Sequence, residues 1–224
     1  MPAKLNKVQV RKEIERIAKE RINRVLPALV DRIESDIDKE IERGMRNSPT
    51  VQSLTAAGTS ELKQELGLTN AEGKVAELID GVKESVAVTA KQLRGGVLAK
   101  KPILEVKVVQ DNLRNLANRD FAFQENSPRF RPELLPWLRW LIEGGRRALV
   151  KNSRIIRGRP GQGRNQGGSI MSRNDPQGTW AMPPEHAGTI TDNFITKVFD
   201  SISNNVRGIV NKRVNASISK IKRA

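Results

Sequence analysis

The sequence predicts an α+β fold with a long N-terminal helix, a small, mostly antiparallel β-sheet with hairpins, a short Trp-containing helix and a long C-terminal helix. Near both ends of the chain, apolar residues recur at the spacing of a helical face. In the middle, short segments alternate apolar and polar residues, which is typical of strands. All three tryptophans lie between residues 134 and 199. Burial of such large side chains indicates a core in that region.

The first predicted helix extends from Lys7 to Arg46, with charged residues between the members of an apolar stripe. The stripe consists of Val10, Ile14, Ile17, Ile22, Val25, Leu26, Leu29, Ile33, Ile37, Ile41 and Met45. Pro27 removes one backbone hydrogen bond, so we expect a kink near it. The stripe covers about 35 residues, or ~50 Å, which is longer than a small core needs.

Two interpretations of this stripe stay open. The helix either packs on the rest of its own chain or packs on a neighbouring subunit. In the second case, the subunit-packing residues are Ile22, Leu26, Leu29, Ile33, Ile37 and Ile41.

The sequence predicts two parts, residues 1–47 as the N-terminal helix and residues 48–224 as an α+β core domain. Gly44 and the segment Asn47-Ser48-Pro49 mark the end of the first helix. A mixed segment follows. A short helix is then predicted from a cap at Thr59 or Ser60 to Gly67.

A further helix is predicted from Asn70 to Asp80, with Val75, Leu78 and Ile79 on one face. Alternation then predicts strands around residues 86–88 and 103–109, separated by a Gly95-Gly96 turn. Residues 114–132 are expected to form an irregular loop anchored by Phe121, Phe123 and Phe130.

The run from Leu134 to Ile142 predicts the short Trp-containing helix, with Pro136 in its first turn and Gly144-Gly145 at its end. Strands are predicted next at residues 147–151, 154–157, 169–172 and 179–182. The basic hairpin loop spans residues 157–168, and residues 175–178 form a turn. The last helix, residues 191–222, is expected to have Thr189 or Thr191 as its cap and Asp192 in its first turn.

The composition excludes several classes of site. Without cysteine, the chain forms no disulfide, zinc thiolate or cysteine nucleophile. The single histidine, His186, has no second histidine or carboxylate cluster for a metal and no triad motif. We expect it to pack or to form a hydrogen bond. No signal peptide or membrane-spanning run is recognisable. The sequence therefore predicts a soluble, intracellularly made protein that is not an enzyme and has no cofactor, metal or membrane partner.

The formal net charge of +15 predicts a polyanionic neighbour, such as nucleic acid, an anionic membrane or an acidic protein surface. Between Gly144 and Asn174 the chain has no acid. The candidate DNA or partner contacts in this tract are Arg146, Arg147, Lys151, Arg154, Arg157, Arg159, Arg164 and Arg173.

The glycine-rich stretch from Gly158 to Gly168 lacks the Lys-Ser/Thr ending of a P-loop and the spacing of a dinucleotide fingerprint. The segment Arg157-Gly158-Arg159-Pro160 resembles the core of an AT-hook, whose arginines enter a narrow minor groove. The alternative is a mobile hairpin tip that its charge keeps soluble. Non-specific phosphate contact needs only positive charge.

Four segments follow one another in the order of a known family. They are Ser-Pro-Thr-Val-Gln-Ser-Leu (48–54), Leu-Lys-Gln-Glu-Leu-Gly-Leu (62–68), Leu-Pro-Trp-Leu-Arg-Trp-Leu-Ile-Glu-Gly-Gly (135–145) and Trp-Ala-Met-Pro-Pro-Glu-His-Ala-Gly-Thr-Ile (180–190). With helices at both ends and a basic hairpin, the chain resembles the neck and tail-completion (minor tail) proteins of tailed bacteriophages, including those of lambda-type phages. The resemblance spans nearly the whole chain and is most specific from Pro136 to Ile195.

This resemblance implies a virion protein at the head–tail junction, in a ring between the portal-side connector and the tail tube, without catalysis. The implied partners are further copies in a cyclic homo-oligomer (hexamer or dodecamer), other phage neck, connector and tail-tube proteins, and genomic DNA through non-specific contact. The many arginines between Arg146 and Arg173 depart from the more acidic segment expected there, which leaves open the surface that faces DNA. The alternative function is a basic nucleic-acid-binding architectural protein that uses the hairpin and the C-terminal tail.

Overall fold

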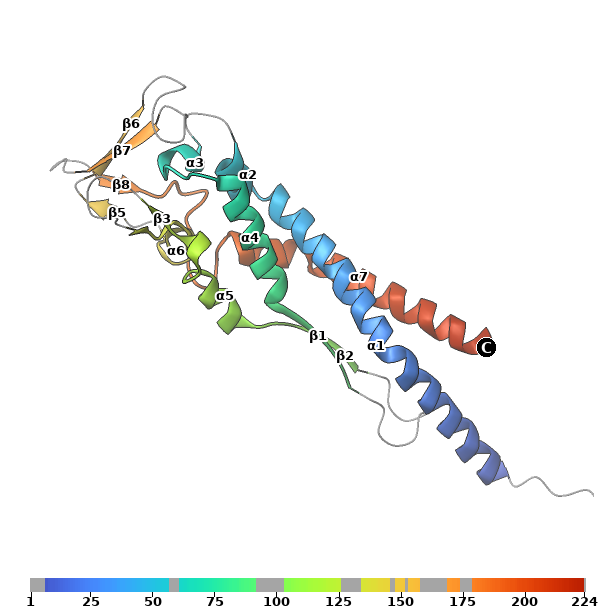
Figure 1. The fold of residues 1–224 in the computed structure, drawn as a ribbon. Coiled ribbons are helices and arrows are strands. Elements are labelled where there is room, and N and C mark those ends of the chain that lie inside the picture. The colour runs from blue at the N-terminus through green and yellow to red at the C-terminus, as the bar shows by residue number, and fades with distance from the viewer. Residues whose placement is uncertain are drawn as a thin grey trace, which may run out of the picture. The chain divides into compact units, whose positions relative to one another are not determined.

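The computed structural model describes residues 7–56, 61–91, 103–125, 134–145, 148–151, 153–157, 169–173 and 179–223. Long helices come first and last in this part of the chain, and short helices and antiparallel strand pairs lie between them (Figure 1). The predicted α+β fold class is therefore confirmed.

The chain divides into two compact units. Unit 1 contains Met1–Glu40, Val86–Val108 and Asn204–Ala224, and unit 2 contains Ile41–Ser85 and Val109–Ser203. Both long helices contribute to both units, because the boundaries fall inside them. This grouping differs from the division at residue 47 that the sequence suggests, since it joins the start of the first helix to the end of the last one.

Helix α1 extends over Lys7–Asn47 and contains Pro27 without ending there. The predicted helix is therefore confirmed, while the kink near Pro27 stays a prediction. Strands β1 (Val86–Lys91) and β2 (Ile103–Val108) pair antiparallel, from Val86 opposite Val108 to Lys91 opposite Ile103. Figure 1 shows this ribbon beside the N-terminal half of α1. The predicted Gly95-Gly96 turn lies outside the described residues.

In unit 1, α1 lies antiparallel to helix α7 (Phe194–Arg223), because later residues of one helix contact earlier residues of the other. The Arg213 guanidinium donates two hydrogen bonds to the Asp36 carboxylate, at 2.7 and 3.0 Å. Asn205 Nδ2 donates to Glu40 Oε1 at 2.6 Å. The bidentate pair lowers the pKa of Asp36 and adds geometric specificity to the contact.

The helices of unit 2 begin with one that the sequence pattern did not indicate. Helix α2 (Pro49–Thr55) follows α1 after one residue, and Ser48 Oγ accepts from Val51 N at 3.2 Å as its N-cap. Ser48-Pro49 ends the first helix as predicted, but the same pair is also a start signal, with Ser as cap and Pro in the first turn.

The remaining helices of unit 2 are α3 (Leu62–Glu65), α4 (Ala71–Glu84), α5 (Gln110–Leu116), the 3₁₀ turn η1 (Asp120–Ala122) and α6 (Trp137–Glu143). The predicted α4 face is confirmed, because Val75, Leu78 and Ile79 are buried. Gly67 has φ +62° and ends the segment of α3. The expected caps Thr59 and Ser60 lie outside the described residues.

The expected irregular loop at 114–132 is wrong over its first half, which holds the end of α5, η1 and strand β3 (Gln124–Glu125). Strand β3 pairs with β4 (Leu134–Leu135). These short elements form because tertiary contacts, rather than a repeated pattern, bury Leu116 and Phe121. Phe130 lies outside the described residues.

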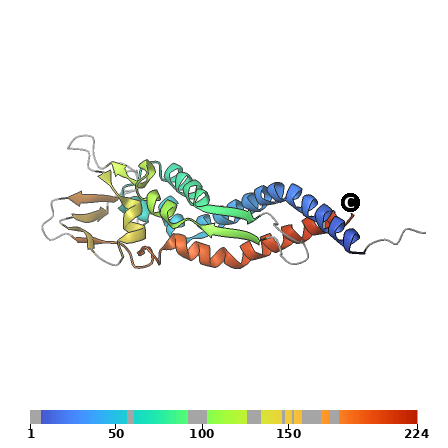
Figure 2. The same ribbon diagram turned by 90° about the horizontal axis from the view of Figure 1, so that it is seen from below.

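The predicted strand region after the Trp-containing helix is confirmed as two antiparallel pairs. Strand β5 (Ala148–Lys151) pairs with β8 (Thr179–Ala181), and β6 (Ser153–Arg157) pairs with β7 (Ser169–Arg173). Figure 2 shows these strands gathered beside α6. The loop at 158–168 and the turn at 175–178 lie outside the described residues.

The tryptophans lie in the core of unit 2, as their size predicts. Trp137 is fully buried, and its Nε1 donates to the Phe121 carbonyl at 2.8 Å. The Trp140 and Trp180 rings have centroids 5.7 Å apart. Trp180 Nε1 donates to Glu65 Oε2 at 3.3 Å. Each buried indole N–H therefore has an acceptor, which removes the cost of burying it.

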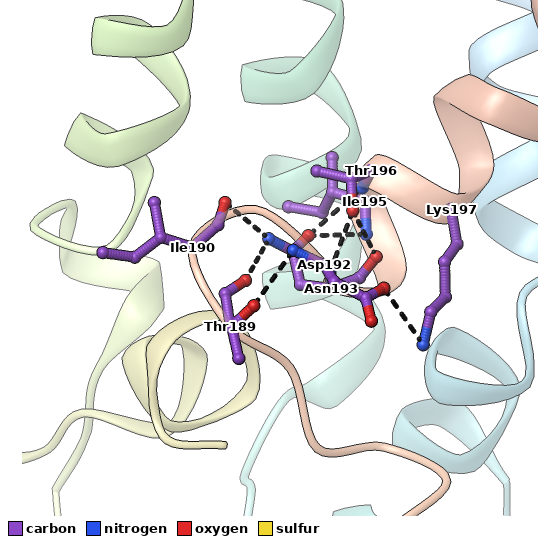
Figure 3. A network of polar contacts seen from close by, with 7 residues as sticks. All are labelled: Thr189, Ile190, Asp192, Asn193, Ile195, Thr196 and Lys197. Carbon is purple, nitrogen blue, oxygen red and sulfur yellow. Dashed lines mark hydrogen bonds and ion pairs between the residues drawn. The ribbon is translucent and has the colours of Figure 1, made fainter.

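The N-cap of α7 is Asn193, so the expected caps Thr189 and Thr191 are wrong (Figure 3). Asn193 Oδ1 accepts from the backbone N–H groups of Ile195 and Thr196, at 3.0 and 3.2 Å. Thr189 Oγ1 accepts from Asp192 N at 3.1 Å and so closes the preceding turn. Asp192 also precedes the helix rather than occupying its first turn. Asn and Ser are equally favourable N-cap residues, and both are more favourable than Thr.

Replacing Asn193 with alanine is expected to lower the free energy of unfolding by about 1–2 kcal/mol, because two helix N–H groups, one of them buried, lose their acceptor. Chemical denaturation of the two proteins measures this difference. Asn193→Ser keeps an acceptor oxygen and should retain most of the stability. Equal unfolding midpoints for the Ala and Ser variants would contradict the assignment of this cap.

Candidate assembly interface

Most of the predicted subunit-packing residues of α1 are covered by the chain itself. Ile22 is half-buried, and the others are buried: Leu26, Leu29, Ile33, Ile37 and Ile41. These five side chains therefore belong to the core of this chain and are not open to a neighbouring subunit. The part of the stripe that a partner can reach lies nearer to the N-terminus.

The apolar stripe changes face between Ile17 and Ile22. At about 100° per residue, Val10, Ile14 and Ile17 lie within about 60° of one another around the helix axis. The five-residue step to Ile22 turns the stripe by about 140°. The first face is exposed, with accessible fractions of 37%, 62% and 40% for Val10, Ile14 and Ile17. Residues on the second face are progressively buried, starting at Leu26.

Two arginines continue the exposed face toward the C-terminus of α1. Arg21 and Arg24 lie within about 60° of the centre of the exposed apolar stripe. Both are exposed, and neither side chain forms a hydrogen bond or ion pair with another described residue. We call the set Val10, Ile14, Ile17, Arg21 and Arg24 the docking face. The part of α1 that carries its apolar end is dark blue in Figure 1.

The flanks of the docking face carry paired charges. Arg16 bonds Glu13 at 2.6 Å and Glu20 at 2.7 Å, and Arg11 pairs with Glu15 at 3.3 Å. Exposed pairs of this kind contribute little to stability, about 0.2–1 kcal/mol each. Their carboxylates can therefore exchange partners at low cost when another surface approaches.

Unit 2 contains a cavity of about 210 Å³ where α5, α6 and the start of α7 meet. Its apolar wall consists of Leu113, Ile142, Ile190 and Ile195. The polar residues that line it are Arg114, Glu143, Thr191, Asn193 and Thr196. Ile190 is 55% exposed. No local pattern in the sequence indicates this cavity, because its walls come from α5, α6 and the segment that leads into α7, which are distant in the chain.

Only part of the predicted basic contact tract lies within the described chain. Arg146, Arg147, Arg159 and Arg164 lie outside the described residues. The backbones of Lys151, Arg154, Arg157 and Arg173 belong to β5, β6 and β7. The register places Arg157 opposite Ser169 and Arg173 opposite Ser153. The pairing of the hairpin strands β6 and β7 is therefore confirmed. Their contact with DNA or a partner stays a prediction.

His186 has the hydrogen-bonding environment that the sequence suggested. Its ring is half-buried, and Nδ1 lies 3.2 Å from Thr50 Oγ1. Burial lowers the pKa of His186 below its ordinary value, an effect that Glu185, Glu61 and Glu65 partly oppose. Within the described chain, no cluster of three or more His, Asp or Glu residues could hold a metal ion.

We predict that the imidazole of His186 titrates below its ordinary pKa of 6.5. The unfolded chain then binds this proton more tightly than the folded chain. Stability should therefore fall as the pH drops below about 6.5 and be retained above it. NMR can measure the titration directly, because the chain has one histidine. A His186 pKa at or above 6.5 would contradict this prediction. So would a His186→Gln variant whose stability depends on pH in the same way as that of the wild type.

Among the described helices, none combines the length and the apolar character needed to span a membrane. No protein-family model matches the chain, and no curated protein or solved structure is detectably similar to it. The family resemblance in the sequence therefore stays a prediction, and the function must be argued from the residues of this chain.

Proposed function

We propose that the chain is a structural subunit of a tailed bacteriophage virion, which forms a ring at the head–tail junction between the portal-side connector and the tail. The observation that carries the assembly role is the exposed docking face at the start of α1. The order of the segments at 48–54, 62–68, 135–145 and 180–190 in the sequence supports the phage setting. The proposal assigns no catalytic step to the chain.

The docking face supports an assembly role because a solvated helix has no need of aliphatic residues on one face. Full burial of a Val or Ile side chain stabilises by about 1.5–3 kcal/mol. Covering three of them supplies a few kcal/mol toward the entropic cost of association. Repetition of the contact around a closed ring multiplies this gain.

Ile14→Asp tests the assembly role, with Val8→Asp as a matched control. Val8 is exposed to the same extent as Ile14, 62%, but lies about 120° away around the axis of the same helix. Light scattering should give a wild-type mass above the 25.0 kDa of one chain. We expect Ile14→Asp to lower this mass and Val8→Asp to preserve it. A wild-type protein that stays monomeric at all concentrations would contradict the proposal.

The alternative function is nucleic-acid binding through the basic hairpin, which the acid-free tract on β5, β6 and β7 favours. Contacts with phosphate alone would give an affinity that falls steeply with salt and does not depend on sequence. Joint replacement of Arg157, Arg159 and Arg164 with serine should then weaken binding to duplexes of any sequence. Wild-type protein without duplex affinity at low salt would eliminate this alternative.

A further inference from the structure

We propose that the docking face of one copy binds the α5–α6–α7 cavity of a second copy, with Ile14 inserted between Ile142, Ile190 and Ile195. This inference rests on the proposed assembly role and assigns both halves of the interface. The contact is head-to-tail, because the two surfaces belong to different parts of the chain.

Pairing of the docking face with itself is disfavoured by its charges. A parallel pair of α1 helices sets Arg21 beside Arg21 and Arg24 beside Arg24, and such like-charge contacts cost free energy. An antiparallel pair with Ile14 opposite Ile17 sets Arg21 opposite Val10, which buries an unpaired charge against an apolar residue. The docking face therefore needs a partner surface that differs from itself.

The cavity has a size and shape that can accept the Ile14 side chain. A cavity of about 150 Å³ with Leu, Ile and Phe walls can hold benzene. The four side-chain carbons of Ile14 therefore fit within about 210 Å³. Ile190, at 55% exposure, extends the apolar wall outward. It can cover Val10 and Ile17, which flank Ile14 on the helix.

The charges at the two surfaces also match. Arg114 lines the cavity and is exposed, and its side chain forms no hydrogen bond or ion pair with another described residue. Glu13 and Glu20 border the docking face on one side, and their carboxylates can pair with Arg114 of the second copy. Glu143 lines the same cavity, forms an exposed ion pair with Arg139 at 3.6 Å, and can also receive Arg21. Such complementary charges orient an interface and steer its formation.

A head-to-tail interface has a structural consequence. After the first contact forms, one copy still has a free docking face and the other still has a free cavity. Successive contacts then close into a ring if the rotation between copies permits it, and otherwise form a filament. A symmetric dimer, in contrast, would stop after two copies.

The test uses two full-length variants, Ile14→Asp and Ile190→Asp, separately and mixed in equal amounts. Each carries one disabled surface and one intact surface. We expect each variant to be a monomer of 25.0 kDa by light scattering and analytical ultracentrifugation. The mixture should form a dimer of twice that mass and nothing larger, because only one of the two possible contacts can form between the variants.

Val8→Asp and Leu134→Asp are the matched controls, since both change an exposed apolar residue outside the two surfaces. Both should assemble as wild type does, and circular dichroism should show that all four variants fold. If Ile190→Asp assembles like wild type while Ile14→Asp does not, the docking face meets another surface. That result overturns this inference and leaves the proposed assembly role intact.

Two further outcomes are decisive. If both variants are monomers and their mixture stays monomeric, the two residues serve separate contacts and the inference fails. If the wild type is monomeric and Ile14 is needed instead for binding to anionic lipid vesicles, the docking face is a membrane contact, and the assembly role fails with it.

Discussion

Replacing Trp137 with alanine is expected to lower the free energy of unfolding by about 3–5 kcal/mol. Its side chain is fully buried in α6, so truncation leaves a large cavity. Truncation also removes the donor to the buried Phe121 carbonyl, which is then left without this partner. For a chain of this size, the loss corresponds to a decrease in Tm of about 10 °C. Thermal unfolding followed by circular dichroism measures it.

Two variants separate the causes of this loss. Trp137→Phe keeps most of the ring volume and removes the N–H, so it should cost about 1–3 kcal/mol. Trp140→Ala truncates a half-buried ring of the same helix and should cost less than Trp137→Ala. If Trp137→Ala unfolds within 1 kcal/mol of wild type, Trp137 is not the centre of this core.

Replacing Gly188 with alanine is expected to destabilise unit 2 by about 3 kcal/mol, at the upper end of the range for overpacking. A Cβ at this position would lie 2.4 Å from the Leu141 carbonyl oxygen and 2.6 Å from Asn193 Cβ. Relief of the clash requires movement of the backbone at the end of α6 or of the α7 cap. The hydrogen bond from Gly145 N to the Gly188 carbonyl, 2.8 Å long, lies at the same place.

Gly208→Ala is the matched control. It makes the same chemical change, but it should raise the stability of the chain instead of lowering it. A Cβ at Gly208 meets no atom within 4 Å, and the residue lies inside α7. Alanine is about 0.8–1 kcal/mol better than glycine in a helix interior. Denaturant titrations should therefore give midpoints below wild type for Gly188→Ala and above it for Gly208→Ala. Equal midpoints for the two variants would disprove the close packing at Gly188.

The positions of most helices and strands follow from local patterns. The helical stripe of α1, the α4 face with Val75 and Leu78, and the alternation in β1 and β2 each reflect a period that one segment contains entirely. The position of the unit 2 core around the tryptophans follows from the size of their side chains. These features are predictable because neighbouring residues in the chain generate them.

Local capping signals were harder to assign, because several residues in one segment can serve the same purpose. Thr189, Thr191 and Asn193 are all suitable caps for α7, and only the structure shows that Asn193 accepts from Ile195 and Thr196. Ser48-Pro49 likewise ends one helix and starts the next. The choice depends on which backbone N–H groups the tertiary fold leaves near each side chain.

The two halves of the proposed interface required the tertiary structure. Ile14 and Ile33 belong to one predicted apolar stripe, but the five-residue step from Ile17 to Ile22 places them on different faces of α1, where Ile14 is 62% exposed and Ile33 is fully buried. The local step separates the two faces, and contacts with segments far away in the chain determine which of the two faces is buried. The cavity with Ile142 and Ile190 arises in the same way. Periodicity thus determines which residues share a face of a helix, whereas long-range packing decides which face the chain covers and which face it leaves for a partner.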